Sequence, residues 1–339
     1  MREMVQGVYA KYKIPAWIAG AAVVLAFPWI FASDTVLSIA ASTLIFMILA
    51  SALNVTNGYI GLFNIGSAGF FCLGAYTTAL LSTRVGLGFF TCFFISAAFT
   101  AFVGALIAIP TSRFSGFYFS IVTMGFSEIV RLIMLNWVSL TKGSNGIHSI
   151  PRPALFGLTI KSMRQYYYLV LIILAITLFC IHRIIHSRVG RAWLSIRENP
   201  DAASSLGVKI TTYKSLNFMV MGFFMGIGGS LMAYYYRYIA PEMFQIDNGH
   251  TVLAMVILGG MGSLPGPLIG AVILNLAMEL FRFASEFRMI AYAIMVVAMM
   301  WLRPQGIIGA TNTVMVSEKS SGRKKTGQRR PSEHDIAGE

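Results

Sequence analysis

The sequence has few charged residues. Only 12% of its 339 residues are Asp, Glu, Lys or Arg, whereas 56% are hydrophobic. A water-soluble domain carries roughly 25% charged residues, so this composition excludes an ordinary soluble enzyme and a disordered protein. Acidic residues are the scarcer sign, with 13 Asp and Glu against 26 Lys and Arg. In a soluble protein this excess would indicate nucleic acid, but here the basic residues lie at the ends of apolar segments, which is the pattern of membrane topology.

The sequence also lacks the motifs of common catalytic and cofactor sites. No G-x-x-x-x-G-K-[ST], H-E-x-x-H or G-x-S-x-G occurs, and the five histidines are dispersed. The three cysteines lie in apolar segments without disulfide or metal-ligand spacing. We therefore expect no catalytic residue, no metal site and no cofactor. If ATP drives this protein, another chain binds the nucleotide.

Long apolar runs predict an all-α, polytopic bundle of about ten transmembrane helices. A helix that crosses the bilayer needs about 20 apolar residues. The apolar runs are Ile14–Ser33, Thr35–Thr83, Val85–Ser112, Phe114–Leu140, Gln165–His182, Ser215–Tyr236, Asn248–Met278 and Met289–Leu302. Two of these runs are long enough for two spans each. We expect breaks within them at Asn54–Gly61 and at Gly259–Pro267.

The distribution of Lys and Arg predicts the orientation. With ten spans and an inside N-terminus, 17 of the 26 basic residues lie inside and 8 outside, and Arg131 lies within a span. Cytoplasmic loops carry the excess of Lys and Arg, so both termini are expected to be cytoplasmic. The predicted organisation is a cytoplasmic N-terminus (1–13), a membrane domain (14–310) with a cytoplasmic loop at 185–213, and a disordered basic tail (311–339). The basic tail is a candidate for contact with anionic lipid.

The loop between the sixth and seventh predicted spans reads GRAWLSIRENPDAASSLGV and contains a short capped helix. Asn199 is a favourable N-cap, and a proline follows at the first helical position. Asp201 complements the helix dipole, and Gly207 is a typical helix stop. A helix at Pro200–Leu206 is too short to be stable alone, so it must pack on the bundle or on a partner protein. Its small apolar face would fit a groove on another protein, and an ordinary interfacial helix is the alternative.

Polar residues interrupt the apolar run around the first break. Asn54, Asn57, Asn64 and Ser67 lie in a glycine-rich stretch. Non-helical backbone is tolerated in a membrane only where protein or a water-filled cavity covers it, and transporter sites are often built at such broken helices. These residues are therefore candidates for a translocation path. The alternative is close helix packing through the small residues of the same stretch.

Glu128 and Arg131 form the only charged pair clearly inside a predicted span. Their i, i+3 spacing places them on one helix face, where they can neutralise each other. Glu128 is a candidate for the translocation path, and a structural ion pair that faces a partner permease is the alternative. An ion-coupled secondary transporter would usually carry more intramembrane Asp, Glu or His residues than this chain has.

Four sequence blocks and a closing segment resemble the LivM-type permeases of branched-chain amino acid ABC importers. In chain order, these blocks are Gly58–Tyr76 (GYIGLFNIGSAGFFCLGAY), Tyr118–Ile147 (YFSIVTMGFSEIVRL ending in KGSNGI), Gly190–Val208 (the loop above), Leu258–Ala271 (LGGMGSLPGPLIGA) and Arg303–Gly309 (RPQGIIG). Each block alone is modest, but their order and spacing over residues 40–309 are specific.

The resemblance implies a permease of a bacterial inner membrane that does not hydrolyse ATP itself. It implies three kinds of partner: a second related permease, two ATP-binding subunits and an extracytoplasmic substrate-binding protein. It assigns ATPase coupling to five residues of the loop: Arg191, Glu198, Asn199, Asp201 and Gly207. Hydrophobic, branched-chain amino acids are the expected solutes.

One departure from the family pattern keeps a second solute class open. The family commonly has S-L-G-H where this chain has Asn64-Ile65-Gly66-Ser67, so a histidine is replaced by Ser67. Permeases of urea and short-amide importers share most of the same blocks. A permease for urea or short amides is therefore the alternative function.

Overall fold

The computed structural model describes residues 25–29, 33–114, 116–155, 158–280, 297 and 306–308. The long helices are α2 (Asp34–Asn54), α4 (Phe89–Thr111), α5 (Gly116–Asn136), α7 (Met163–Ile185) and α10 (Ile210–Tyr236). The shorter helices are α3 (Ser67–Leu80), α6 (Val138–Thr141), α8 (Arg188–Glu198), α9 (Pro200–Ser205), α11 (Ile246–Gly259) and α12 (Gly266–Leu280). Two π-helical segments, η1 (Val55–Ile60) and η2 (Leu81–Val85), extend α2 and α3, and two short 3-10 helices are η3 (Gly143–Asn145) and η4 (Pro241–Phe244).

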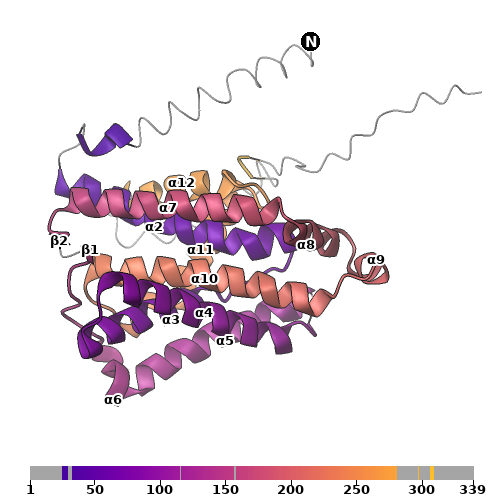
Figure 1. Ribbon diagram of the computed structural model, residues 1–339, viewed down its shortest axis with the longest axis horizontal. Coiled ribbons are helices and arrows are strands. Elements are labelled where there is room, and N and C mark those ends of the chain that lie inside the picture. The colour runs from indigo at the N-terminus through magenta and orange to yellow at the C-terminus, as the bar shows by residue number, and fades with distance from the viewer. Residues whose placement is uncertain are drawn as a thin grey trace, which may run out of the picture.

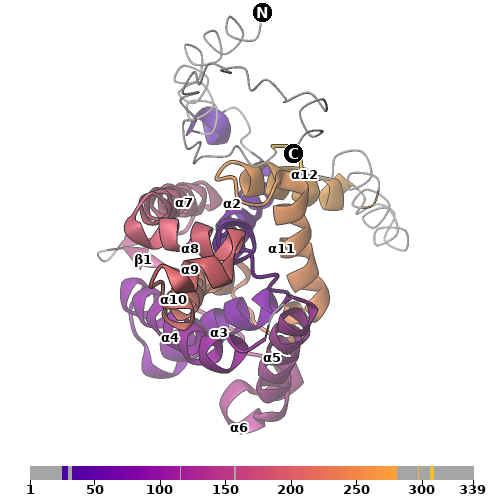
Figure 2. The same ribbon diagram turned by 90° about the vertical axis from the view of Figure 1, so that its right-hand side faces the viewer.

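The long helices lie side by side as a bundle, and α8 and α9 project from one end of it (Figure 1). We call this the α9 end. Figure 2 looks onto the α9 end and shows α5 on the side of the bundle away from α7. A two-stranded hairpin of β1 (Ala154–Leu155) and β2 (Leu158–Thr159) lies at the opposite end. The described part of the chain is therefore an all-α bundle with one minimal hairpin.

Five described helices are long and apolar enough to cross a membrane, and they coincide with expected spans. They are Asp34–Ile60, Phe89–Thr111, Gly116–Asn136, Met163–Ile185 and Ile210–Tyr236. Three shorter helices lie at the two runs that were expected to hold two spans each: α3 lies within Thr35–Thr83, and α11 and α12 overlap Asn248–Met278 and extend two residues beyond its ends. Met289–Leu302, apart from Val297, and most of Ile14–Ser33 lie outside the described residues, as do the segments 1–13 and 311–339. The expected total of ten spans therefore stays a prediction.

The core of the bundle lies around α10, which packs on α4, α3 and α2. Close approach is possible because small residues meet at the crossings, which is typical of membrane helices. A Cβ atom on Gly222 of α10 would lie 2.5 Å from the carbonyl oxygen of Thr100 on α4. A Cβ atom on Gly74 of α3 would lie 2.7 Å from the Cα of Gly226. Neither backbone can move away cheaply, so these positions require glycine.

The first break begins later in the chain than the sequence predicts. The helix continues past Asn54 through η1, so that α2 and η1 together have 27 residues and a length of about 40 Å. It ends at Gly61, whose φ of +76° is in the left-handed region that glycine adopts without strain. The chain is then non-helical until Ser67, where α3 begins. The polar stretch therefore divides into a helical part and a non-helical part.

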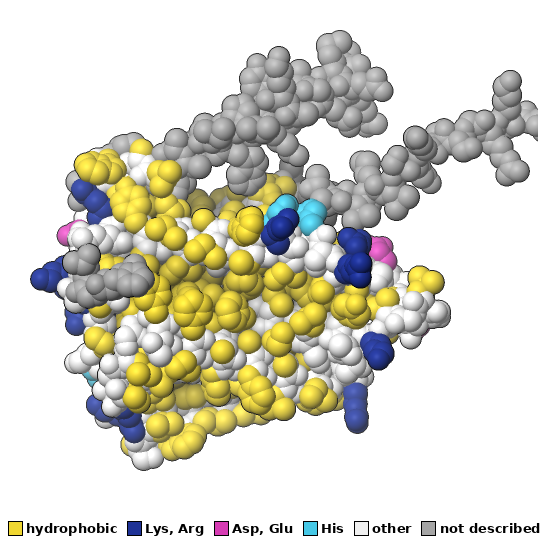
Figure 3. All heavy atoms as spheres, in the orientation of Figure 1, with side chains coloured by type: hydrophobic (Ala, Val, Ile, Leu, Met, Phe, Trp, Pro, Cys, Tyr) yellow, Lys and Arg dark blue, Asp and Glu magenta, His cyan; other side chains and the backbone are white. Residues whose placement is uncertain are grey.

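On the face of the bundle drawn in Figure 3, charged side chains gather towards its two ends. Hydrophobic side chains cover the surface between these ends, as Figure 3 shows for one face. Several large apolar side chains on α4 and α7 are exposed, among them Phe94, Phe102, Ile172 and Phe179. Such an apolar belt between polar ends is what a bilayer requires of the surface that faces its hydrocarbon core.

Candidate functional site

Helix α8 is anchored to the bundle by buried contacts. Ser187 caps its N-terminus by accepting a hydrogen bond from the backbone N–H of Val189 at 3.2 Å. Trp193 is fully buried, and its Nε1 donates to the carbonyl oxygen of Tyr213 on α10 at 2.9 Å. Because an indole is large and its N–H is satisfied here, this contact fixes α8 against the start of α10.

Helix α9 follows directly and has the predicted caps. The Asn199 Oδ1 accepts from the backbone N–H groups of Asp201 and Ala202, both at 3.0 Å. Gly207 has a φ of +84° and ends the turn, as expected. The helix runs over Pro200–Ser205, one residue shorter than predicted. The capped helix is confirmed, and its boundaries follow from local sequence.

The apolar face of α9 divides between the bundle and solvent. Ala203 is buried, whereas the Leu206 side chain is 85% exposed. The predicted coupling residues Arg191, Glu198, Asn199, Asp201 and Gly207 are all exposed. One side of α9 thus rests on the bundle, as an interfacial helix would, and the other side is accessible. The coupling role of these residues stays a prediction.

The two breaks that the sequence predicts meet each other at the α9 end. The Asn54 Nδ2 donates to the carbonyl oxygen of Ser263 at 2.8 Å, and the Asn54 Oδ1 accepts from the backbone N–H of Gly262 at 2.9 Å. A Cβ atom on Gly58 would lie 2.3 Å from the Gly262 nitrogen, so the two backbones are in close contact. Asn54, which is 2% exposed and is the last residue of α2 before η1, therefore joins this helix end to the turn between α11 and α12.

Arg197 reaches the same place from α8. Its Nη1 donates to the carbonyl oxygen of Gly58 at 2.6 Å. Its side chain also lies over Gly61 and beside Gly262. Sequence reasoning missed this residue, because only the fold brings it to η1. The only local indication of a role for Arg197 was its position two residues before Asn199, the cap of α9.

The closing segment of the chain returns to this junction as well. The backbone N–H of Ile307 donates to the carbonyl oxygen of Leu258 at 2.9 Å, and that of Ile308 donates to Gly259 at 3.0 Å. Residues from three of the sequence blocks and from the closing segment thus belong to one structural unit: Gly58, Arg197, Gly262 and Ile307. We call the region where Asn54, η1, the 260–265 turn and Arg197 meet the inner junction.

The remaining candidates for the path are buried and hydrogen-bonded. Asn57 and Asn64 bond each other twice at 3.2 Å through side chain and backbone, and the Asn64 Oδ1 accepts from the Gly66 N–H at 2.8 Å. The Ser67 Oγ donates to the carbonyl oxygen of Gly249 at 3.4 Å, where α3 meets α11. These side chains satisfy the broken backbone, which is what buried non-helical segments require. Their role in a translocation path stays a prediction.

Two further residues stabilise this break and were not singled out from the sequence. Asn217 on α10 accepts a hydrogen bond from the Thr56 hydroxyl at 2.7 Å and donates to the Val55 carbonyl oxygen at 3.0 Å. Thr123 on α5 accepts from the Ile65 N–H at 3.3 Å. The break is therefore held from α10 on one side and from α5 on the other.

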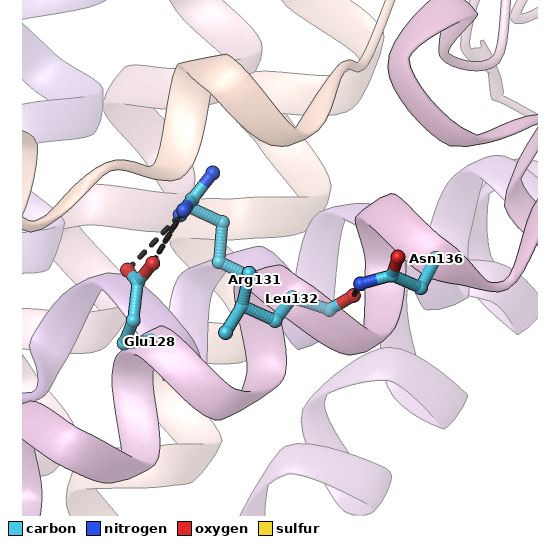
Figure 4. Close-up of polar contacts among 4 residues, drawn as sticks. All are labelled: Glu128, Arg131, Leu132 and Asn136. Carbon is cyan, nitrogen blue, oxygen red and sulfur yellow. Dashed lines mark hydrogen bonds and ion pairs between the residues drawn. The ribbon is translucent and has the colours of Figure 1, made fainter.

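The ion pair of Glu128 and Arg131 forms as predicted and lies on a partly exposed face of α5 (Figure 4). The Arg131 Nε donates to both carboxylate oxygens of Glu128, at 3.0 and 3.1 Å, and its Nη2 also contacts the carboxylate. The Glu128 side chain is 32% exposed and that of Arg131 19% exposed. Within the described residues, no group of three or more His, Cys, Asp or Glu side chains has the arrangement of a metal site.

Comparison with known proteins agrees with the resemblance. Residues 35–302 match the family model described as the branched-chain amino acid transport system permease component. The chain is 38% identical over 315 residues to the high-affinity branched-chain amino acid transport system permease protein LivM of Escherichia coli K12 and of Salmonella typhimurium, covering 86% of this chain and 74% of each relative. It is 26% identical over 292 residues to the permease protein LivH of Escherichia coli K12, covering 78% of this chain and 91% of LivH. No solved structure matches. The chain therefore belongs to the family of branched-chain amino acid transport system permease components.

Proposed function

We propose that this chain is one of two permease subunits of an ABC importer, and that it carries branched-chain amino acids across the bacterial inner membrane. The observation that carries the proposal is the inner junction, because a capped, accessible helix outside the apolar belt is connected there to both broken helices of the bundle. Such an arrangement gives a partner protein a surface to move and a rigid route into the membrane domain. The relatives named for branched-chain amino acid transport supply the solute class.

In this mechanism the α9 end faces the cytoplasm. The excess of Lys and Arg expected on that side of the chain supports this orientation. ATP-driven closure of two partner ATPases would displace α9, and the bundle would change between outward-facing and inward-facing states. This is a two-state element whose equilibrium is biased by a ligand at a remote site. An external binding protein would deliver the solute to the opposite end.

Uptake by reconstituted vesicles tests the proposal. The chain is combined with a LivH-type permease, the ATPases and the binding protein, and uptake of labelled leucine and of urea is measured in parallel. We expect leucine uptake that requires ATP and the binding protein. Uptake of urea alone would replace the solute class, and uptake without ATP would refute the importer mechanism.

A glycine substitution in α9 tests coupling. Gly207 has a positive φ and open space around its Cα, so Gly207→Val strains the backbone at the end of α9 without a clash. We expect an assembled complex that transports poorly. Gly86 is a matched control, because it also has a positive φ (+70°) and open space but lies next to η2, near the other end of the bundle. Equal losses in Gly207→Val and Gly86→Val would contradict a specific coupling role.

We further propose that the second permease covers the face of α5 that carries Glu128 and Arg131. A charged side chain near the bilayer centre costs about 3 kcal/mol by insertion scales, and such residues usually face protein or water. Along the middle of α4 and α7 the exposed large side chains are apolar, such as Phe102 and Ile172, whereas the middle of α5 combines exposed apolar residues with this ion pair. The face of α5 is therefore a better surface for a partner, or for a path between two permeases, than for lipid.

Photo-crosslinking distinguishes these surfaces. A photoreactive residue at position 129 replaces Ile129 on α5, which is 58% exposed, and the control replaces Phe102 on α4, which is 65% exposed. We expect a crosslink to the second permease from position 129 and to lipid from position 102. Crosslinks to lipid from both positions would refute the assignment of α5.

A further inference from the structure

Arg197 occupies the point at which the projecting segment joins the membrane domain. It is the penultimate residue of α8, and Asn199, the cap of α9, follows two residues later. Its guanidinium bonds the Gly58 carbonyl oxygen at 2.6 Å, whereas Trp193, one turn earlier, fixes α8 on α10. The side chain of Arg197 therefore links the start of α9 directly to η1.

The partner of Arg197 is the C-terminal end of a long helix. Gly58 lies in the last turn of the 27-residue helix Asp34–Ile60. Carbonyl groups in the last turn of a helix lack intrahelical partners and carry the negative end of the helix dipole, so a cation is stabilised there. A hydrogen bond from a charged donor is also stronger than one between neutral groups. This contact is thus suited to hold the helix end at α8.

The same guanidinium is seated between the two breaks. A Cβ atom on Gly61 would lie 2.9 Å from the Arg197 Cγ, and a Cβ atom on Gly262 would lie 2.9 Å from its Nη1. Both glycines also have positive φ values, of +76° and +79°. Any larger side chain at either position would displace Arg197. The two turns therefore form a seat that fits an arginine side chain.

Asn54 links the end of α2 to the turn between α11 and α12. Its side chain bonds both Gly262 and Ser263, at 2.9 and 2.8 Å. The Ser263 Oγ in turn accepts from the Gly266 N–H at 3.1 Å, at the start of α12. Hydrogen bonds on the backbone and side chain of Ser263 thus connect the end of α2 to the beginning of α12.

We propose that Arg197 is the positioning residue that transmits the movement of α9 to both broken helices, acting through the carbonyl oxygen of Gly58 and the 260–265 turn. The inference rests on the proposed function and adds a residue outside the set that the sequence assigned to coupling. Arg197 acts on no solute itself. It holds the inner ends of α2 and α12 in register with the segment that the ATPases displace.

The test measures coupling separately from assembly. The complete complex is reconstituted with wild-type chain, Arg197→Gln, Arg197→Lys or Arg188→Gln, and leucine transported per ATP hydrolysed is determined. Arg188→Gln is the matched control, because Arg188 is also exposed on α8 and loses the same charge at the other end of that helix. Co-purification of all subunits and the midpoint of thermal unfolding are recorded for each variant.

We expect Arg197→Gln to assemble normally and to hydrolyse ATP, but to transport about tenfold less leucine per ATP, which is the effect of losing one charge-assisted hydrogen bond. Arg197→Lys keeps the charge but not the planar fork, so we expect a partial recovery. An Arg197→Gln complex with the wild-type ratio would overturn the proposal. So would a loss of assembly, because Arg197 would then be a structural residue. A wild-type complex that does not transport leucine would refute the proposed function instead.

Discussion

Substitution of the buried Asn54 should lower the stability of the protein more than substitution of an exposed asparagine. Asn54→Ala leaves the Ser263 carbonyl oxygen buried without its donor and the Gly262 N–H without its acceptor. An unsatisfied buried polar group costs about 1–3 kcal/mol, and the Gly262 group is only partly buried, so the two together cost about 3 kcal/mol. Alanine has a helix propensity about 0.5 kcal/mol better than asparagine, which offsets a small part. The net expectation is a loss of about 2–3 kcal/mol in the free energy of unfolding.

The matched control is Asn136→Ala. Asn136 is exposed at the end of α5, and its Nδ2 donates to the Leu132 carbonyl oxygen within the same helix (Figure 4). Removal of its side chain should lower the free energy of unfolding by less than about 0.5 kcal/mol, as at most surface positions. Both variants are unfolded in mixed micelles with increasing SDS, and tryptophan fluorescence gives the free energy of unfolding. A difference below about 1 kcal/mol between Asn54→Ala and Asn136→Ala would refute the reasoning that Asn54 joins the two breaks.

Three further expectations concern packing and capping. Gly222→Ala should lower the free energy of unfolding by about 2 kcal/mol or more, because the new Cβ would clash with the Thr100 backbone. The control Gly125→Ala, in open space on α5, should leave this free energy unchanged or raise it by about 0.5–1 kcal/mol. The same SDS titration compares the two variants. Asn199→Ala removes the N-cap and should destabilise α9 by about 1 kcal/mol. We expect faster hydrogen exchange of the backbone amides at residues 200–206 and no change in the rest of the bundle. Trp193→Ala should lower the free energy of unfolding by about 3–5 kcal/mol, because it opens a cavity beneath α8. We also expect α8 and α9 to detach from the bundle and become sensitive to protease. Retention of protease resistance would contradict the anchoring role.

Features that depend on residues close together in the sequence could be predicted from the sequence. The α9 helix is specified by its own cap, proline and terminal glycine, and the structure contains it within one residue of the predicted end. Apolar runs likewise predicted the described spans, since a bilayer selects helices by length and hydrophobicity alone. The Glu128–Arg131 pair follows from i, i+3 spacing on a single helix. In each case the deciding property belongs to one continuous segment of the sequence.

The π-helical end of α2 shows where local reasoning was insufficient. The polar residues after Asn54 and the glycines near them predicted an early break, but Thr56 bonds Asn217 on α10, and this contact lies within the continuing helix. The break moves to Gly61, where a positive φ is required. Tertiary contacts thus decide which glycine ends the helix.

The membrane class, the helical segments and the capped helix follow from composition, the length of the apolar runs and capping, because these depend on solvent and on short-range contacts. The inner junction depends on tertiary structure, because its partners are distant in the chain: Arg197 and Gly58 are 139 residues apart, and Asn54 and Gly262 are 208 residues apart. Nothing in the local sequence of an exposed arginine indicates which carbonyl group it will bond. Only the packing of α2, α8 and the α11–α12 turn at one end of the bundle brings these groups within hydrogen-bonding distance.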